Sequence, residues 1–291
     1  CVFIVLWSLL VYSPVAHWVW HPEGWLLKRG SLDFAGGTVV HFTSGISALV
    51  FAIMIGKRKR PGPPHNLTMT LLGAGILWFG WFGFNAGSAL SSGGLAAVAL
   101  INTHLAAAAA MLSWLLVEKL KHGKATALGA ASGLVAGLVV ITPCAGFVSP
   151  LSAIGIGLLG GAICFGGVML KGKLGYDDSL DAFGVHGVGG FTGGILLGLF
   201  AQKAYNSAGQ DGVFFGGGTT LLVENAIGLI AAGLWAVIIT AILVKILDVT
   251  MGLRTDEEME SEGLDQGIHG ESGYSLGRGA GGHMEAAEPA E

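Results

Sequence analysis

Charged residues are scarce in this chain of 291 residues: they make up 12% of the sequence, against about 25% in an ordinary soluble domain. Hydrophobic residues make up 52%, so this composition disfavours a water-soluble enzyme. Proline is also scarce, with 8 residues, whereas glycine occurs 50 times without a Gly-X-Y period. Neither a collagen-like repeat nor a proline-rich linker explains that glycine content. Glycine inside apolar runs is instead typical of tightly packed membrane helices.

Cysteine is almost absent, with only Cys1, Cys144 and Cys164. These residues form no Cys-x-x-Cys pair, and two of them lie in apolar stretches, so we expect buried free thiols rather than a disulfide framework or a zinc site. No cofactor and no nucleic-acid partner is indicated. The chain opens at Cys1 inside an apolar run and without an initiator methionine. We therefore expect a fragment whose N-terminal part is missing.

Eight apolar runs approach or exceed the roughly 20 residues that a helix needs to cross a membrane. They cover residues 1–20, 34–56, 67–89, 93–117, 125–143, 149–170, 182–202 and 219–248. Short breaks with turn residues and charges separate them. Since only helices satisfy the backbone polar groups of so many successive spans, the sequence predicts an all-α membrane protein built as a multi-span helical bundle.

The distribution of charge predicts the orientation of that bundle. The alternate connections at residues 57–60, 119–124 and 171–173 hold nine Lys and Arg, whereas the intervening ones hold Lys28, Arg29 and Lys203. The positive-inside rule places the nine-cation set in the cytoplasm. We therefore expect a multi-pass protein of the cell membrane, with the region from Trp18 to Trp25 outside and the acidic C-terminal tail in the cytoplasm.

Glycine spacing indicates which helix faces pack closely. Small residues four apart let two helix backbones approach each other. The repeats are Gly129/Gly133/Gly137, Gly157/Gly161, Gly189/Gly193 and Gly190/Gly194.

Two histidines lie inside the predicted spans, where an ionisable side chain is a functional candidate by default. His41 follows Asp33 by eight residues, and His186 follows Asp178 by the same spacing, 145 residues later. In the predicted orientation the two segments run in opposite directions, as an inverted repeat would. Two unrelated core histidines, each bonded to a carbonyl, remain the alternative, and both aspartates can serve as helix N-caps. No third ligand accompanies the histidines, so we expect no metal site.

Aromatic and small polar side chains mark the outer end of the spans: Trp20, Phe82, Phe84 and Ser88. Tryptophan at this depth is typical of an interfacial belt. A cation-binding mouth is the other interpretation, because desolvated aromatic faces attract cations.

Four sequence motifs resemble those of the ammonium transporter family (Amt/Mep, related to Rh proteins): Asp33–His41, Gly80–Ser88, Phe183–Gly187 and Glu262–Asp265. The resemblance extends from Cys1 to about Tyr274. It implies a homotrimer with eleven spans and one pore per subunit, of which this chain has the fourth to the eleventh. Residues 1–252 would form the transporter domain, 253–274 a cytoplasmic regulatory segment, and 275–291 a disordered tail.

The resemblance also implies roles for single residues. Trp20 and Ser88 match the external ammonium recruitment site, which favours the Amt branch over Rh. Phe84 matches the inner of two gate phenylalanines, the other lying in the missing segment. His41 and His186 match the twin histidines that line the pore.

Asp33 and Trp81 match residues that shape the vestibule from behind. The regulatory segment contacts PII-type signalling proteins in many bacteria. Its matching residues are Glu262, Gly263, Leu264, Asp265 and Tyr274.

The chemistry of such a pore follows from the cost of moving an ammonium-sized ion into a low dielectric, on the order of 20 kcal/mol before relaxation. Deprotonation near His41 and His186 removes most of that cost, and neutral ammonia then crosses. Transport is electrogenic if the proton follows separately, and the pore is a gas channel if the proton returns outside. A membrane ammonium sensor is the alternative function. His104, Glu224 and Asn225 receive no role from the sequence.

Overall fold

The structure, a computed structural model, describes residues 1–62, 65–271 and 273. Tyr274 and the tail 275–291, for which the sequence predicts a regulatory contact and disorder, lie outside the described residues. The chain divides into two units. Unit 1 comprises Cys1–Lys57 and Gly62–Leu253, and unit 2 comprises Arg58–Pro61 and Arg254–Glu291.

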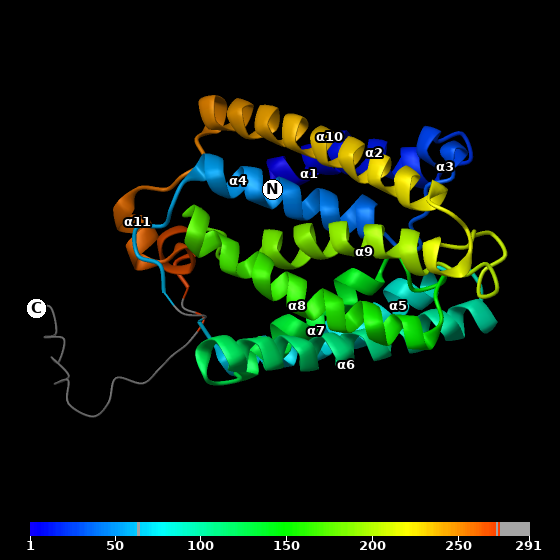
Figure 1. Ribbon diagram of the computed structural model, residues 1–291. Helices are drawn as coiled ribbons and strands as arrows, with labels where there is room; N and C mark the ends of the chain where they lie inside the picture. Colours follow the sequence, from blue (N-terminus) through cyan, green and yellow to red (C-terminus); the bar gives the residue numbers. More distant parts are fainter. Residues whose placement is uncertain (63–64, 272, 274–291) are drawn as a thin grey trace, which may run out of the picture. The chain divides into compact units, whose positions relative to one another are not determined.

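Every regular element among the described residues is helical, which confirms the all-α prediction. Seven helical segments of unit 1 are long and apolar enough to cross a membrane, and they lie side by side in Figure 1. They are Val2–Arg29 (α1 Val2–Trp7, η1 Ser8–Tyr12, α2 Ser13–Trp20 and α3 Trp25–Arg29), Gly37–Ile55 (η2 Gly37–Phe42 and α4 Thr43–Ile55), α5 (Leu67–Gly87), α6 (Gly94–His122), α8 (Pro150–Leu174), Phe183–Phe200 (η3 Phe183–Gly187 and α9 Val188–Phe200) and α10 (Thr220–Met251).

The one remaining predicted span, residues 125–143, contains a shorter helix than expected. It forms α7 (Ala127–Ile141), an apolar helix of 15 residues and therefore about 22 Å long. Pro143 follows closely and has no N–H group with which to continue the helical hydrogen bonds. The chain then makes a series of buried turns before Ser149 caps α8 by accepting a hydrogen bond from the amide of Ser152.

The glycine repeats lie on the contact faces that their spacing predicts. A Cβ atom on Gly137 or on Gly157 would collide with the backbone of Ala106, so α7 and α8 both press closely against α6. Gly133 and Gly161 extend these two contacts by one helical turn. The glycines of α9 are similarly confined by neighbouring residues of η2, α7 and α10.

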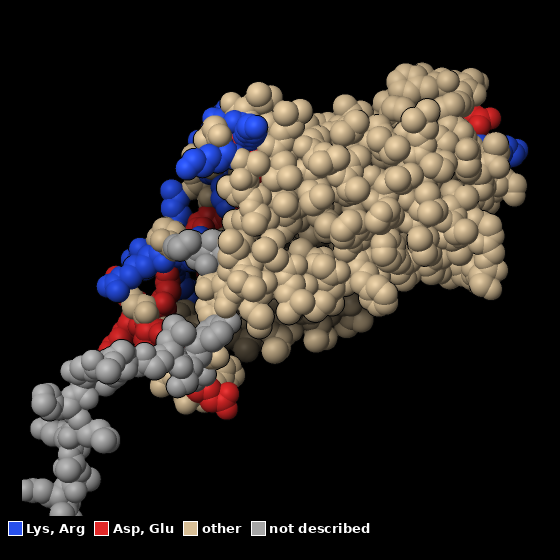
Figure 2. Space-filling view, turned by 90° about the horizontal axis from the view of Figure 1, so that it is seen from below, with Lys and Arg blue, Asp and Glu red and all other residues tan. Residues whose placement is uncertain are grey.

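The surface of unit 1 suits a bilayer. Figure 2 shows a broad face of the helical bundle without Lys, Arg, Asp or Glu. Large apolar side chains are extensively exposed on the long helices, among them Leu72 and Phe79 on α5 and Leu151 on α8. Exposed apolar surface of this extent is unusual for a soluble monomer. It is expected for the membrane-spanning helices described above.

Unit 2 contains a short helix held by its own charged residues. Asp256 caps α11 (Glu257–Glu262) by accepting a hydrogen bond from the Met259 amide at 2.8 Å. Glu260 accepts hydrogen bonds from the Lys59 amide at 2.7 Å and from the Arg254 guanidinium at 2.8 Å. These donors, the Lys59 amide first, lower the pKa of the Glu260 carboxyl.

The predicted regulatory residues lie at the end of α11 and just after it. Gly263 turns the chain with a φ of 103° between α11 and η5 (Asp265–His269), and the flanking Glu262, Leu264 and Asp265 are exposed.

Candidate functional site

Asp33 organises the turn that carries His41. The carboxylate is buried and accepts four backbone hydrogen bonds, from Gly36 and Gly37 on one oxygen and from residues 38 and 39 on the other, at 2.7 to 3.1 Å. These are N–H groups at the start of a helix, which have no partner within the helix. Burial raises the pKa of the Asp33 carboxyl, while the four N–H donors act in the opposite direction. The Asp33 carboxylate thus satisfies the N–H groups at the start of η2, whose N-cap position is Gly36.

Asp178 occupies the corresponding place before His186 but makes fewer contacts. Its carboxylate accepts one hydrogen bond, from the Phe183 amide at 2.8 Å. The Lys171 ammonium binds the Asp178 carbonyl oxygen at 3.1 Å and also pairs with the Asp181 carboxylate. Burial raises the pKa of Asp181, and the Lys171 partner opposes that rise. The turn before His186 is therefore held mainly by the contacts of Lys171 with residues 178 and 181.

The two histidine segments repeat each other at the constant offset of 145 residues. A π-helical turn, η2 or η3, carries each histidine at its next-to-last position and leads into an α-helix of 13 residues, α4 or α9. The two α-helices run in opposite directions in Figure 1. The sequence spacing therefore corresponds to two matching structural elements.

The two segments cross at a pair of glycines that occupy equivalent positions. A Cβ atom on Gly45 would collide with the backbone of Gly187, and a Cβ atom on Gly190 would lie 2.6 Å from the amide nitrogen of Phe42. Gly45 and Gly190 are themselves 145 residues apart, as are Phe42 and Gly187. Each glycine thus admits the backbone that precedes the other helix, and this close crossing brings the histidines together.

The imidazoles of His41 and His186 contact each other directly. Their Nδ1 atoms lie 3.1 Å apart, and the ring centroids lie 5.2 Å apart with an interplanar angle of 32°. A hydrogen bond between two neutral rings requires one Nδ1 to donate and the other to accept. Nε2 of His41 is buried and has no hydrogen-bond partner among the described residues. This geometry excludes the reading of two unrelated core histidines that each bond a carbonyl through Nδ1.

Aromatic rings line one side of this pair. Trp81 stacks on His41 with the centroids 5.1 Å apart and the planes at 15°, and Phe84 lies 5.9 Å from the same imidazole. The Trp81 indole N–H donates to the Thr142 hydroxyl at 3.0 Å, which fixes the ring. Trp81 thus contacts His41 itself. The spacing of Trp81 and Phe84 was the available signal, because residues three apart share a helix face.

The two remaining predicted binding residues lie around this group. The Trp20 indole donates to the carbonyl oxygen of Asp33 at 2.8 Å, so Trp20 is linked to the capping turn of η2. Ser88 lies one turn after Phe84 on α5, and its hydroxyl donates to the Phe84 carbonyl at 2.8 Å. The structure therefore joins Phe84 directly to His41, and joins Trp20 to the histidine turn through Asp33.

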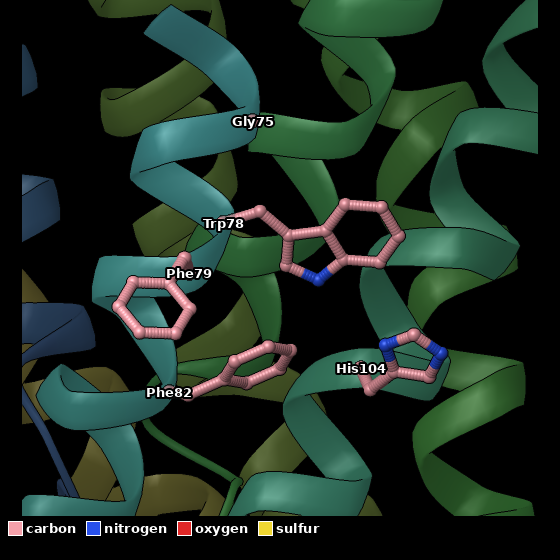
Figure 3. Close-up of a pocket in the computed structure, with 5 residues that line it drawn as sticks. All are labelled: Gly75, Trp78, Phe79, Phe82 and His104. Atoms are coloured by element: carbon pink, nitrogen blue, oxygen red, sulfur yellow. The ribbon is translucent and has the colours of Figure 1, made fainter. Parts of the chain in front are cut away.

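Phe82, which the sequence places with Phe84 at the outer end of the spans, does not lie beside the histidine pair. Figure 3 shows it instead in a separate hollow between α5 and α6, with Gly75, Trp78, Phe79 and His104. Residues two apart on an α-helix point about 200° away from each other, so Phe82 and Phe84 face opposite sides of α5. His104 stacks on Trp78 at 5.2 Å, which gives it a place outside the histidine pair.

The described residues contain no cluster of three or more His, Cys, Asp or Glu side chains that could hold a metal ion. Cys144 and Cys164 are buried thiols, and the sulfur of Cys144 lies 3.3 Å from the carbonyl oxygen of Gly193. The chemistry that the site offers is therefore that of the two imidazoles and the aromatic rings beside them.

Comparison with known proteins identifies relatives of this chain. Residues 1–274 match the sequence profile described as the Ammonium Transporter Family. An ammonium transporter of Bacillus subtilis is 54% identical over 275 residues, which is 94% of this chain and 68% of the relative. The crystal structure of Saccharomyces cerevisiae Mep2 superposes with a TM-score of 0.83 at 41% identity and covers 88% of this chain and 60% of Mep2.

A structure titled Sensor Amt Protein superposes with a TM-score of 0.80 at 33% identity, covering 89% of this chain and 67% of that protein. The chain thus spans between 60% and 68% of the length of these three relatives.

Proposed function

The chain belongs to the ammonium transporter family, and on that premise we propose that it carries ammonium across a membrane as ammonia, past His41 and His186. Its apolar helices make it a multi-pass membrane protein, and its family is one of transporters. The observation that carries the proposal is the contact between two imidazoles inside an apolar bundle, with Nδ1 atoms 3.1 Å apart.

The energetic argument concerns the ion's charge. Transfer of an ammonium-sized ion into a low dielectric costs on the order of 20 kcal/mol before relaxation, and the aromatic walls around His41 offer no compensating carboxylate. Loss of the proton removes most of this cost. An imidazole pair can accept a proton at one nitrogen and release one from another, so His41 and His186 can separate the proton from ammonia. Potassium and sodium have no proton to lose and are excluded by such a route.

The residues around the pair supply recruitment and gating in this proposal. Trp20, which is 38% exposed, offers an aromatic face to an arriving cation. Ser88 offers a hydroxyl oxygen at the end of α5, and Phe84 lies between that end and His41. We assign Trp20 and Ser88 to ammonium recruitment and Phe84 to the inner gate.

A direct test is uptake of methylammonium into proteoliposomes that contain the full protein. We expect His41→Ala and His186→Ala to change flux or its selectivity over potassium. His104→Ala is the matched control, because it removes an imidazole that stacks on Trp78 in a separate hollow. The proposal fails if the wild-type protein carries no methylammonium, or if His104→Ala reproduces both pore variants.

Sensing is the second candidate function, since the structure titled Sensor Amt Protein shares this fold. The same flux assay separates the two functions: a sensor without transport would bind ammonium and show no uptake.

Assembly and regulation complete the proposal. The apolar outer face of α5 is compatible with burial in a homotrimer, and a positive-inside orientation would place unit 2 in the cytoplasm. There Glu262, Leu264 and Asp265, which are exposed, would meet a PII-type signalling protein together with Gly263 and Tyr274. Cross-linking of the intact protein in membranes, with and without a purified PII-type protein, tests both statements.

A further inference from the structure

Asn225 on α10 is a buried amide whose hydrogen bonds join three parts of the chain. It is 2% exposed. Its Oδ1 accepts from the Ser31 hydroxyl at 3.1 Å and from the Leu32 amide at 2.9 Å, while its Nδ2 donates to the Gly194 carbonyl at 3.0 Å. Both polar atoms of the side chain are therefore engaged, and none of the contacts is local in sequence.

The partners of Asn225 lie on both halves of the repeat. Leu32 immediately precedes Asp33, whose carboxylate caps the turn that carries His41. Gly194 lies on α9, eight residues after His186. Asn225 thus links the segment that sets the position of one imidazole to the helix that carries the other.

Two further contacts hold residues 29–32, the segment that leads to Asp33. Arg29 makes a two-point ion pair with Glu224, at 2.7 and 3.0 Å. Gln210 donates to the Gly30 carbonyl at 3.0 Å, where Gly30 adopts a φ of 92° that favours glycine. A second anchor beside Asn225 therefore fixes the approach to Leu32.

We propose that Asn225 is a positioning residue for the histidine pair. It acts through Leu32 and Asp33 on His41, and through Gly194 on the helix of His186. The amide side chain presents an acceptor oxygen to Ser31 and Leu32 and a donor nitrogen to Gly194 at the same time. The inference rests on the proposed transport function, because positioning is read out as flux.

Two substitutions of Asn225 remove different sets of its hydrogen bonds. Asn225→Asp keeps an oxygen for Ser31 and Leu32 but loses the donor to Gly194. Asn225→Leu, of similar size, loses all three bonds. Asn102→Asp is the matched control: Asn102 is a buried amide on α6 whose Nδ2 donates to the carbonyl oxygens of Ala145 and Val148, each at 2.8 Å, and neither partner belongs to a histidine segment.

The experiment measures methylammonium flux per folded protein in proteoliposomes, with folded protein quantified by gel filtration in detergent. For Asn225→Asp we expect maximal flux to fall about tenfold, because small displacements of the groups at a reacting centre lower rates strongly. The half-saturating concentration should stay within about twofold, since the partners of Asn225 are Ser31, Leu32 and Gly194 rather than the recruitment residues. Asn102→Asp should retain wild-type flux per folded protein.

The inference is overturned if Asn225→Asp behaves as Asn102→Asp does, with any loss of flux explained by loss of folded protein. Should Asn225→Leu fail to fold, Asn225→Asp alone decides. Absence of flux in the wild-type protein is a different outcome, because it refutes the proposed transport function itself.

Discussion

Replacement of Asp33 by asparagine tests how the turn before His41 is held. The Asp33 carboxylate accepts four backbone N–H groups, two on each oxygen. An asparagine retains one acceptor oxygen and turns an NH2 group toward the other two donors. Each buried donor left unsatisfied costs about 1–3 kcal/mol, so two such donors predict a loss of about 2–6 kcal/mol in the free energy of unfolding.

Asp178→Asn is the matched control for that substitution. The Asp178 carboxylate accepts a single N–H, from Phe183, and an asparagine can turn its remaining oxygen toward this donor. We expect a loss below about 1 kcal/mol. The assay is unfolding of each variant in mixed detergent micelles, followed by tryptophan fluorescence, together with hydrogen exchange of the amides of residues 36–39. Equal losses for the two variants, or a wild-type stability for Asp33→Asn, would refute the reasoning.

Two further predictions concern the helix crossing and unit 2. Gly45→Ala and Gly190→Ala should each destabilise the fold by about 1–3 kcal/mol through overpacking, whereas Gly155→Ala, at an open position, should be neutral or stabilising; thermal unfolding distinguishes these outcomes, and tolerance of both crossing variants would contradict the packing described. Because the folded pKa of Glu260 is lowered, its hold on the Lys59 amide is complete above the ordinary carboxyl pKa and is lost as pH falls through the lowered value. Hydrogen exchange of the Lys59 amide, corrected for its intrinsic rate, should show this loss of protection only in acid, and Glu260→Ala should show it at neutral pH; equal protection in that variant would contradict the contact.

Much of the helical order follows from the sequence because lipid-length apolar runs admit few alternatives. The exception is the span at residues 125–143, where apolar length predicts more helix than forms: Pro143 interrupts the hydrogen bonds although the composition stays apolar. The histidines were conspicuous for the opposite reason, as polar side chains inside apolar runs. Their common distance from an aspartate then indicated related surroundings.

Contacts between distant segments could not be read in the same way. Gly45 has no small residue four positions away, so nothing in its neighbourhood reveals that it meets Gly187. Asn225 was left without a role because its partners, Ser31, Leu32 and Gly194, are far from it in sequence. Depth along the helix groups Phe82 with Phe84, whereas the direction of the side chain separates the two.

The central claim is that a proton must leave the substrate at the His41–His186 pair before it can cross. The measurement that tests this claim most directly compares uptake of ammonium and of potassium by the complete protein under voltage clamp. We predict ammonium uptake with no potassium conductance above background, whether or not the ammonium signal carries current. Potassium passing at a rate comparable to ammonium would contradict the account.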